Sequence, residues 1–233
     1  MVAGVTVVAV VALAGCSMIV ADPHCVGDQD CAQAQNTVPQ DTTPDTTPVT
    51  VPGTGVPGDS TPSTEAPTTT IAAQPYVAIG ESVMVGAVNQ LQAGGFYVDA
   101  KENRGPEGVK NAVIKLRDAG VLGAGSSLVI QVGTNAPMGA SEVAAIIAEI
   151  PSGVSAVYFM TLHGSGVSWI PGNNELIRSL PTSHPGVQVI DWDARAGEVE
   201  LCGDGIHITC GGSGPAIFYT NLILGAVGLP AIS

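Results

Sequence analysis

The sequence predicts an α/β fold in which a doubly wound, five-stranded parallel sheet lies between two layers of helices, over residues 74–233. Two observations predict it. Strand-like and helix-like segments alternate along this part of the chain, and βα units with right-handed crossovers build such a three-layer sheet. The strand candidates are short, continuous apolar runs, as at residues 128–132, which is typical of parallel strands covered on both faces.

The elements follow one another with short connections. Strands are predicted at residues 76–79, 96–98, 128–132, 156–161 and 187–192, and helices at 82–92, 107–119, 141–149, 173–180 and 214–224. Pro106 suits the first turn of its helix, and Gly120 suits the end of that helix. Ligands of a doubly wound sheet bind beyond the carboxyl ends of its strands, so the residues after each strand are the first candidates for a site.

Residues 1–21 form an uncharged, mostly apolar run with two open interpretations. In the first, Leu-Ala-Gly-Cys at 13–16 is a lipobox-like cleavage site and Cys16 becomes the lipidated first residue of a lipoprotein, although a secretory signal normally begins with positive charge. In the second, the run is a membrane-spanning helix of about 20 residues, the last span of a longer protein. Both place the remaining residues outside the cytoplasmic membrane.

Two further segments precede the folded domain. Residues 22–34 contain Cys25 and Cys31, for which export favours a small disulfide loop over a zinc site. Residues 35–73 are rich in Thr and Pro and have too little apolar surface to offset the entropy of ordering. We interpret them as a disordered linker that holds the domain away from the membrane.

The charge distribution excludes some partners. The net charge is −13, and all seven Lys and Arg residues fall between Lys101 and Arg195. Nothing in this pattern neutralises a run of phosphates, so we expect no nucleic-acid partner. A polybasic contact with anionic lipid is excluded for the same reason, which leaves membrane contact to the N-terminal segment.

Ser82 stands in Gly80-Glu81-Ser82, where the first strand turns into the first helix. A serine at such a turn faces the crevice at the carboxyl end of the sheet, and its own backbone N–H lies at a helix N-terminus. That position suits a nucleophile and an oxyanion donor. A serine that only caps the helix has the same local sequence.

Asp204 and His207 give the serine a chemical context. They are three residues apart in a Gly-rich loop before the last helix. This spacing lets the carboxylate reach Nδ1 of the imidazole while Nε2 points at a serine across the crevice. A serine hydroxyl becomes nucleophilic when a base takes its proton and a third group fixes the tautomer of that base. The combination predicts a Ser-His-Asp triad.

Three segments resemble sequence blocks of the SGNH (GDSL-like) hydrolases: Gly-Glu-Ser-Val-Met-Val-Gly at 80–86, Gly-Thr-Asn at 133–135 and Asp-Gly-Ile-His at 204–207. The resemblance covers roughly residues 75–228. It looks closest to the C-terminal extracytoplasmic SGNH domain of bacterial acyltransferase-3-type membrane O-acyltransferases, which Val-Ile-Asp-Trp at 189–192 and an Asn-rich turn after Trp169 also resemble. It implies a flavodoxin-like sheet.

The resemblance implies a role for each matched residue. Ser82 would be the nucleophile, His207 the general base and acid, and Asp204 the residue that orients it. The oxyanion donors would be the backbone N–H of Ser82, the side-chain amide of Asn135 and, on a looser match, the backbone N–H of Gly105. Glu81 departs from the family, which usually has Asp there; we expect this difference to affect the rate more than the type of reaction.

Cys202 and Cys210 bracket the Asp204–His207 loop. In an exported protein we expect them to form a disulfide that rigidifies the loop. The rival is a Cys-His-Cys zinc site, which lacks an evident fourth ligand and would consume His207. Two weaker candidates are His163, which follows the fourth strand, and Arg104, which either holds a substrate carboxylate or is merely exposed.

The sequence therefore predicts an extracytoplasmic serine esterase or O-acyltransferase that acts on O-acyl groups, expected to be acetyl, of cell-envelope carbohydrate. No nucleotide-binding or calcium motif occurs, and we expect no cofactor and no metal. A transferase would need a membrane component as acyl donor. The alternative is a non-catalytic, envelope- or glycan-binding lipoprotein on a hydrolase fold, with Glu81 as a sign of lost activity.

Overall fold

The computed structural model describes residues 72–233 of the chain. The predicted apolar segment with Cys16, the segment with Cys25 and Cys31, and nearly all of the predicted linker lie outside the described residues. The strands are β1 (Tyr76–Gly80), β2 (Tyr97–Ala100), β3 (Ser127–Ile130), β4 (Ala156–Met160) and β5 (Val187–Ile190). The helices are α1 (Ser82–Val85), α2 (Val88–Ala93), α3 (Pro106–Asp118), α4 (Ala140–Ala148), α5 (Ile170–Ser183), the 3-10 turn η1 (Ala196–Glu198) and α6 (Gly214–Ala226).

The five strands form one sheet in the order β2-β1-β3-β4-β5, and every pair is parallel. The predicted doubly wound fold is confirmed. The chain moves from β1 to one side of the sheet for β2 and then to the other side for β3. The loops after β1 and β3 therefore diverge at a topological switch point, beyond the carboxyl ends of the strands, where ligands bind in folds of this kind.

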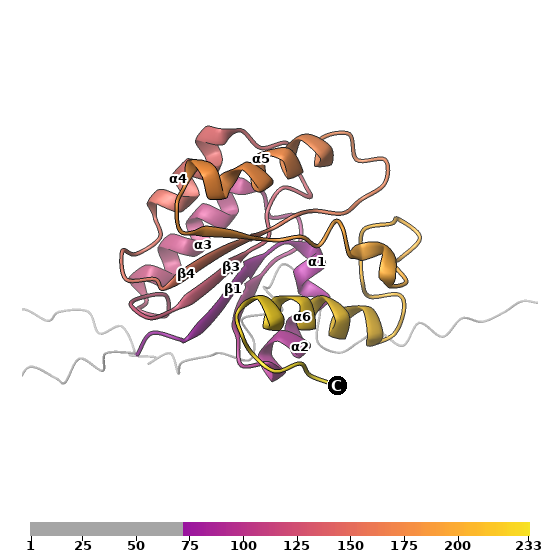
Figure 1. The fold of residues 1–233 in the computed structure, drawn as a ribbon, viewed down its shortest axis with the longest axis horizontal. Helices are drawn as coiled ribbons and strands as arrows, with labels where there is room; N and C mark the ends of the chain where they lie inside the picture. The colour runs from indigo at the N-terminus through magenta and orange to yellow at the C-terminus, as the bar shows by residue number, and fades with distance from the viewer. Residues whose placement is uncertain (1–71) are drawn as a thin grey trace, which may run out of the picture.

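Two layers of helices cover the sheet, as Figure 1 shows: α3, α4 and α5 lie on one face, and α1, α2 and α6 on the other. The apolar strands explain this arrangement, because both of their faces need cover. In β3, Leu128 and Ile130 point into the core under α3, α4 and α5, and Val129 points into the core under α1, α2 and α6. All three side chains are fully buried. The rigid sheet thereby fixes the loops that leave its carboxyl edge.

The predicted helix at 82–92 is wrong in one respect, because α1 ends at Val85 and α2 begins at Val88. The interruption falls at Gly86, against which Ile208 and Thr209 pack. A side-chain Cβ at this position would lie 2.8 Å from Cγ2 of Thr209 and 3.1 Å from Cγ1 of Ile208. Gly86 therefore lets the loop that carries His207 approach the helix that carries Ser82.

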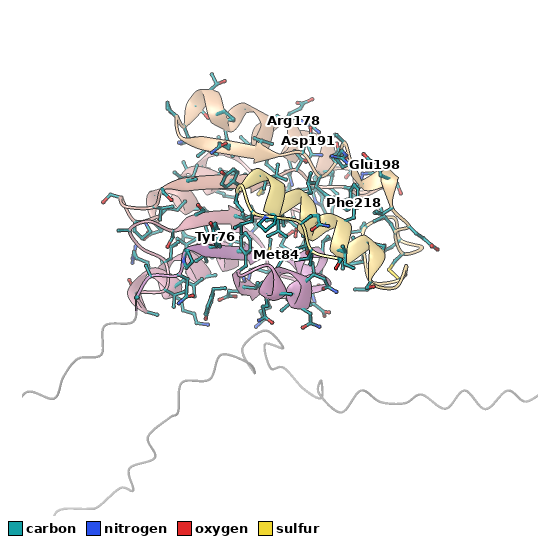
Figure 2. All side chains as sticks on the ribbon, turned by 60° about the horizontal axis from the view of Figure 1, so that its bottom comes forward. Tyr76, Met84, Arg178, Asp191, Glu198 and Phe218 are labelled. Atoms are coloured by element: carbon teal, nitrogen blue, oxygen red, sulfur yellow. A yellow bond between two sulfur atoms is a disulfide. The ribbon has the colours of Figure 1, made fainter. Side chains whose placement is uncertain are left out.

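Two other elements differ from expectation. Helix α5 is longer than predicted and runs through Pro181, and η1 was not predicted. Within residues 72–233, no helix has the length and apolar character needed to cross a membrane. Figure 2 shows Arg178 and Asp191 at the β5 edge of the sheet, apart from Tyr76 and Met84 in the region of β1 and α1.

Candidate active site

Ser82 is the first residue of α1, directly after β1, and it is half-buried. The turn that aims it is tightly packed. A Cβ on Gly80 would lie 2.5 Å from the sulfur of Met84, whose side chain is fully buried in the core behind the turn. Only glycine fits at position 80, and the backbone on both sides of Ser82 is held by the sheet and the core.

Glu81 is fully buried and joins two loops of the site. Its Oε1 accepts a hydrogen bond from the backbone N–H of Gly133 at 2.9 Å, and its Oε2 accepts one from Thr134 at 2.7 Å. Burial raises the pKa of this carboxyl, while the two N–H donors and the charge of Arg104 act in the opposite direction. The longer side chain thus reaches from the β1 turn to the β3 loop, and this departure from the family pattern is well accommodated.

His207 and Asp204 meet Ser82 with the spacing that a triad requires. Nε2 of His207 lies 2.9 Å from Oγ of Ser82, and Nδ1 lies 2.6 Å from Oδ2 of Asp204. When the Nδ1 proton faces the carboxylate, Nε2 is free to accept the serine proton. The structure therefore brings together three side chains that are separated by up to 125 positions in the chain.

The carboxylate of Asp204 is organised by its own loop. Its Oδ1 accepts hydrogen bonds from the backbone N–H groups of Ile206 at 2.8 Å and His207 at 3.1 Å. The hydrogen bond with the His207 side chain, followed by those two backbone donors, lowers the pKa of Asp204 to about 2. The carboxylate therefore stays ionised over any ordinary working pH and holds the imidazole in one orientation.

A disulfide closes this loop by joining Cys202 to Cys210. The backbone N–H of Cys202 also donates to the carbonyl of His207 at 2.8 Å, and Gly205 donates to the carbonyl of Cys202 at 2.8 Å. Gly205 has a φ of +67°, which the tight turn between Asp204 and His207 requires. Because both sulfurs are bonded to each other, neither is available to the zinc site considered as the rival.

The predicted oxyanion donors lie around the same turn. Asn135 follows β3, and Gly105 is the N-cap of α3, beyond the end of β2. The side-chain amide of Asn135 donates to the carbonyl of Arg104 at 3.2 Å, in the peptide unit that also contains the N–H of Gly105. This contact joins the loop before α3 to the loop after β3.

Three residues at the start of α5 support these loops in ways that sequence reasoning missed. The side chain of Asn173 donates to the carbonyls of Gly133 at 2.8 Å and Ala136 at 3.0 Å, and the Trp169 indole donates to the carbonyl of Thr134 at 3.2 Å. Asn174 makes two bonds with the backbone of Leu162. These asparagines lie inside the helix, so the predicted Asn-rich turn is wrong.

A signal for these supports was present in the sequence. Asn173 and Asn174 occur between Ile170 and Ile177, at the spacing of the buried stripe of a helix. Polar groups buried in such a stripe must find hydrogen-bond partners. Loop backbone has polar groups that no helix or strand pairs, so buried amides on a helix predict a loop support.

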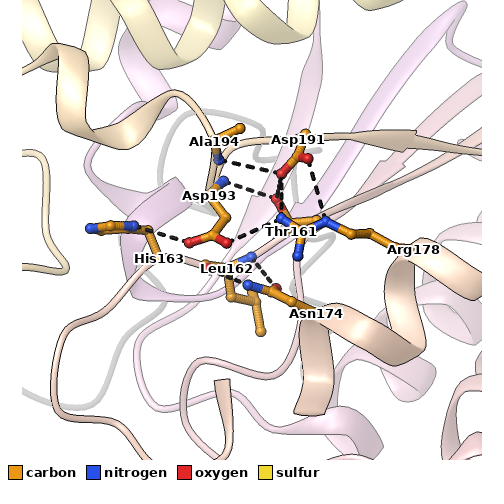
Figure 3. A network of polar contacts seen from close by, with 8 residues as sticks. All are labelled: Thr161, Leu162, His163, Asn174, Arg178, Asp191, Asp193 and Ala194. Carbon is orange, nitrogen blue, oxygen red and sulfur yellow. Dashed lines mark hydrogen bonds and ion pairs between the residues drawn. The ribbon is translucent and has the colours of Figure 1, made fainter. Parts of the chain in front are cut away.

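Neither weaker candidate takes part in the triad. Figure 3 shows His163 in a separate network, where Nδ1 lies 3.1 Å from Oδ1 of Asp193 and Arg178 bridges Asp191 and Asp193. The interpretation of Arg104 as merely exposed is wrong, because its side chain is only 8% exposed and its guanidinium donates to the carboxylate and the carbonyl of Asp99, at 2.5 and 2.6 Å. Its other interpretation, as a residue that holds a substrate carboxylate, stays a prediction. Arg104 thus stabilises the loop that follows β2.

No protein-family profile and no curated protein sequence matches the chain. Among solved structures, the C-terminal catalytic domain of peptidoglycan O-acetyltransferase A (OatA) from Streptococcus pneumoniae, with a methylsulfonyl adduct, is similar with a TM-score of 0.59 at 19% identity, over 67% of this chain and 94% of that one. A putative acylhydrolase from Bacteroides fragilis has a TM-score of 0.50 at 14% identity, over 66% of this chain and 86% of that one. A GDSL-like lipase from Bacteroides thetaiotaomicron has a TM-score of 0.50 at 13% identity, over 66% and 87%. The described residues have the fold of the SGNH (GDSL-like) hydrolases.

Proposed function

We propose that the chain is an extracytoplasmic serine esterase or O-acyltransferase that acts on O-acetyl groups of cell-envelope carbohydrate. One observation carries the proposal: the contacts of 2.9 Å between Ser82 and His207 and of 2.6 Å between His207 and Asp204. A serine hydroxyl, an imidazole and an ionised carboxylate in this order form a nucleophile, its base and the group that orients the base.

In the first half of the reaction, Oγ of Ser82 attacks the carbonyl carbon of the sugar ester while its proton passes to Nε2 of His207. The tetrahedral intermediate carries its negative charge on the former carbonyl oxygen. The N–H groups of Ser82, Gly105 and Asn135 are the proposed donors to this oxygen, and each is worth about 3–4 kcal/mol of transition-state stabilisation in comparable sites. Collapse breaks the bond to the sugar oxygen, which takes the proton from His207 and leaves acetyl-Ser82.

In the second half, water or a sugar hydroxyl gives its proton to Nε2 of His207 and attacks the acetyl carbon. Collapse returns the proton to Oγ of Ser82. Water as acceptor yields acetate, and a sugar hydroxyl yields a new ester. The imidazolium that forms in each half is stabilised by Asp204, whose pKa of about 2 keeps it negatively charged.

The choice of substrate and location has separate support. The structural neighbour from Streptococcus pneumoniae is a peptidoglycan O-acetyltransferase, which favours acetyl groups on an envelope glycan. The disulfide between Cys202 and Cys210 is typical of an oxidising compartment outside the cytoplasm. The uncharged apolar run at residues 1–21 is the proposed attachment to the membrane. If the chain is a transferase, a membrane component is the proposed acyl donor.

A fluorophosphonate probe tests the proposal, because it reacts only with an activated serine. We expect the purified chain to be labelled, with Ser82 as the modified residue, and Ser82→Ala to be unlabelled. Ser165→Ala is the matched control, because Ser165 is exposed and outside the triad. An unlabelled wild-type chain, or labelling that survives Ser82→Ala, would contradict the proposal. Retention of envelope glycan by both chains without ester turnover would instead support the binding protein considered as the alternative.

A further inference from the structure

An open groove of about 410 Å³ lies beside the candidate active site, between the end of β2 and the face of α3 that carries Gly108 to Lys115. Strand β2 forms an edge of the sheet, so the groove opens at the side of the molecule. Among its lining residues are three cations, Lys101, Arg104 and Lys115, and two carboxylates, Asp99 and Glu102. The groove therefore carries one positive charge in excess.

This excess contrasts with the rest of the protein. The chain has a net charge of −13 and only seven Lys and Arg residues, of which three line this one groove. The overall field of such a chain repels an anionic ligand. A local excess of positive charge next to the site is therefore the feature that would admit a negatively charged part of a substrate.

The floor of the groove is built and rigid. Arg104 and Asp99 form an ion pair of 2.5 Å, and their side chains are 8% and 9% exposed. The Nζ of Lys115 lies 3.7 Å from the second carboxylate oxygen of Asp99, and half of its side chain is exposed. Arg104 already neutralises Asp99 at close range, so the longer contact leaves Lys115 able to turn toward a ligand.

The groove meets the active site at Gly105. This glycine lines the groove and is also a candidate oxyanion donor, and a Cβ built on it would find open space, with no atom within 4 Å. The carbonyl of the preceding residue, Arg104, accepts the amide of Asn135 at 3.2 Å. A sugar whose ester carbonyl rests against Gly105 can therefore extend over this residue into the groove.

We propose that this groove binds an anionic group of the acylated glycan, with Lys115 as the residue that recognises it. The inference rests on the proposed esterase or acyltransferase function and adds a substrate class to it. The anionic group that a glycan offers is the carboxylate of an acidic sugar or a phosphodiester. Both groups share the same chemistry, and the experiment distinguishes them.

The test compares three O-acetylated oligosaccharides that are identical except for one sugar. That sugar is glucose in the first, glucuronic acid in the second, and glucose that carries a methyl phosphodiester in the third. We expect kcat/KM to be higher for an anionic substrate than for the neutral one, and which anion is preferred identifies the source. The ratio of kcat/KM for the anionic substrate to kcat/KM for the neutral one measures the preference. Lys115→Met is expected to reduce this ratio about fivefold, as for one exposed ion pair, and Lys115→Arg is expected to preserve it. Added salt should reduce the ratio toward one.

Lys110→Met is the matched control, because it removes the same charge from the same helix while Lys110 pairs with Glu107 at 2.8 Å and does not line the groove. It should leave the ratio as in the wild-type chain. Equal kcat/KM for the three substrates, or an equal effect of both methionine variants, would overturn the proposal.

A binding measurement separates this proposal from the proposed function. Calorimetry with the glucuronic acid oligosaccharide without acetyl groups, on the Ser82→Ala chain, requires no turnover. We expect the Kd to rise about fivefold on adding Lys115→Met and to stay constant on adding Lys110→Met. If binding depends on Lys115 but the wild-type chain turns over no ester, the proposed anion site is supported and the proposed esterase or acyltransferase function is contradicted. Turnover of the esters without any Lys115 effect would do the reverse.

Discussion

The nucleophile side of the site, Glu81 and Ser82, differs from the base side, Asp204 and His207, in burial and in what holds it. Glu81 is fully buried and tied to the β3 loop by two backbone N–H groups, and Ser82 begins a helix directly after β1. Asp204 is exposed. Its loop is held by short-range hydrogen bonds and by a disulfide between two cysteines that lie eight positions apart in the sequence.

The comparison shows two ways to fix a reactive side chain. The nucleophile side shares its contacts with the core, so a change there disturbs folding as well as geometry. The base side contacts the core through Ile208, which is fully buried, and through the partly buried Ile206, while the Asp204 carboxylate itself is exposed, so a change in that carboxylate acts mainly on the reaction. Replacing one carboxylate by an amide on each side should separate stability from rate.

The largest effect is expected from Asp204→Asn, which leaves the shape of the base side intact but removes its charge. The imidazole then loses the group that fixes its tautomer, and kcat for an acetyl ester should fall about 10⁴-fold. The free energy of unfolding should fall only modestly at neutral pH, because the interactions of this exposed carboxylate are screened by solvent. Asp118→Asn, which removes an exposed charge on α3, controls for net charge. Near-normal turnover by Asp204→Asn would show that Asp204 does not orient the base.

The double variant Cys202→Ser, Cys210→Ser removes the covalent closure of the base side. A loop of this length stabilises the folded state by about 2–3 kcal/mol in the chain-entropy model. Urea unfolding of the double variant measures that loss, and kcat/KM measured well below the midpoint reports the position of His207. We expect both to fall. An unchanged kcat/KM would mean that the hydrogen bonds of the loop suffice to place the imidazole.

Glu81→Gln tests the nucleophile side with the same chemical change as Asp204→Asn. An amide has one acceptor oxygen, so the N–H of Gly133 or of Thr134 would face an NH₂ group and remain unpaired. Leaving a buried donor unsatisfied costs about 1–3 kcal/mol in the free energy of unfolding. The exposed Glu107→Gln is the matched control. A variant as stable as the wild-type chain would remove the distinction between the two sides.

Local sequence patterns were sufficient to predict the sheet and the residues that meet in the candidate triad. Short apolar runs define buried parallel strands, and the order of βα units then sets which loops share an edge. Ser82 was recognisable from its place after a strand, and His207 from Asp204 three residues before it. The contact of 2.9 Å between Ser82 and His207 agrees with that expectation, while their roles stay a proposal.

Long-range contacts explain what local patterns missed. The break between α1 and α2 falls at Gly86, against which Thr209 packs from more than a hundred residues away. Arg104 looks in the sequence like any loop arginine, but Asp99 and the turn at Asn103, with a φ of +54°, direct it inward. The two hydrogen bonds that Glu81 accepts could likewise not be predicted from local sequence, because they form only when β1 and β3 lie side by side.

The smallest effect, and the sharpest contrast between the two sides, is expected in the pH dependence of stability. The pKa of Asp204 is lowered to about 2, so its contribution is complete above the usual Asp pKa of about 3.9 and is lost as pH falls toward 2. The pKa of Glu81 is raised, so its contribution is complete below the usual Glu pKa and is lost as pH rises through the raised value.

The stability differences between wild type and the two amide variants should therefore change with pH in opposite directions. On acidification, the difference in unfolding free energy between wild type and Asp204→Asn should shrink below about pH 4. The difference between wild type and Glu81→Gln should grow as pH falls toward about 4.3, because protonation of Glu81 favours the folded state. Urea unfolding of the three chains across this pH range measures both slopes. Slopes of the same sign would mean that Glu81 is not desolvated in the folded protein, and the contrast between a buried and an exposed side would fail.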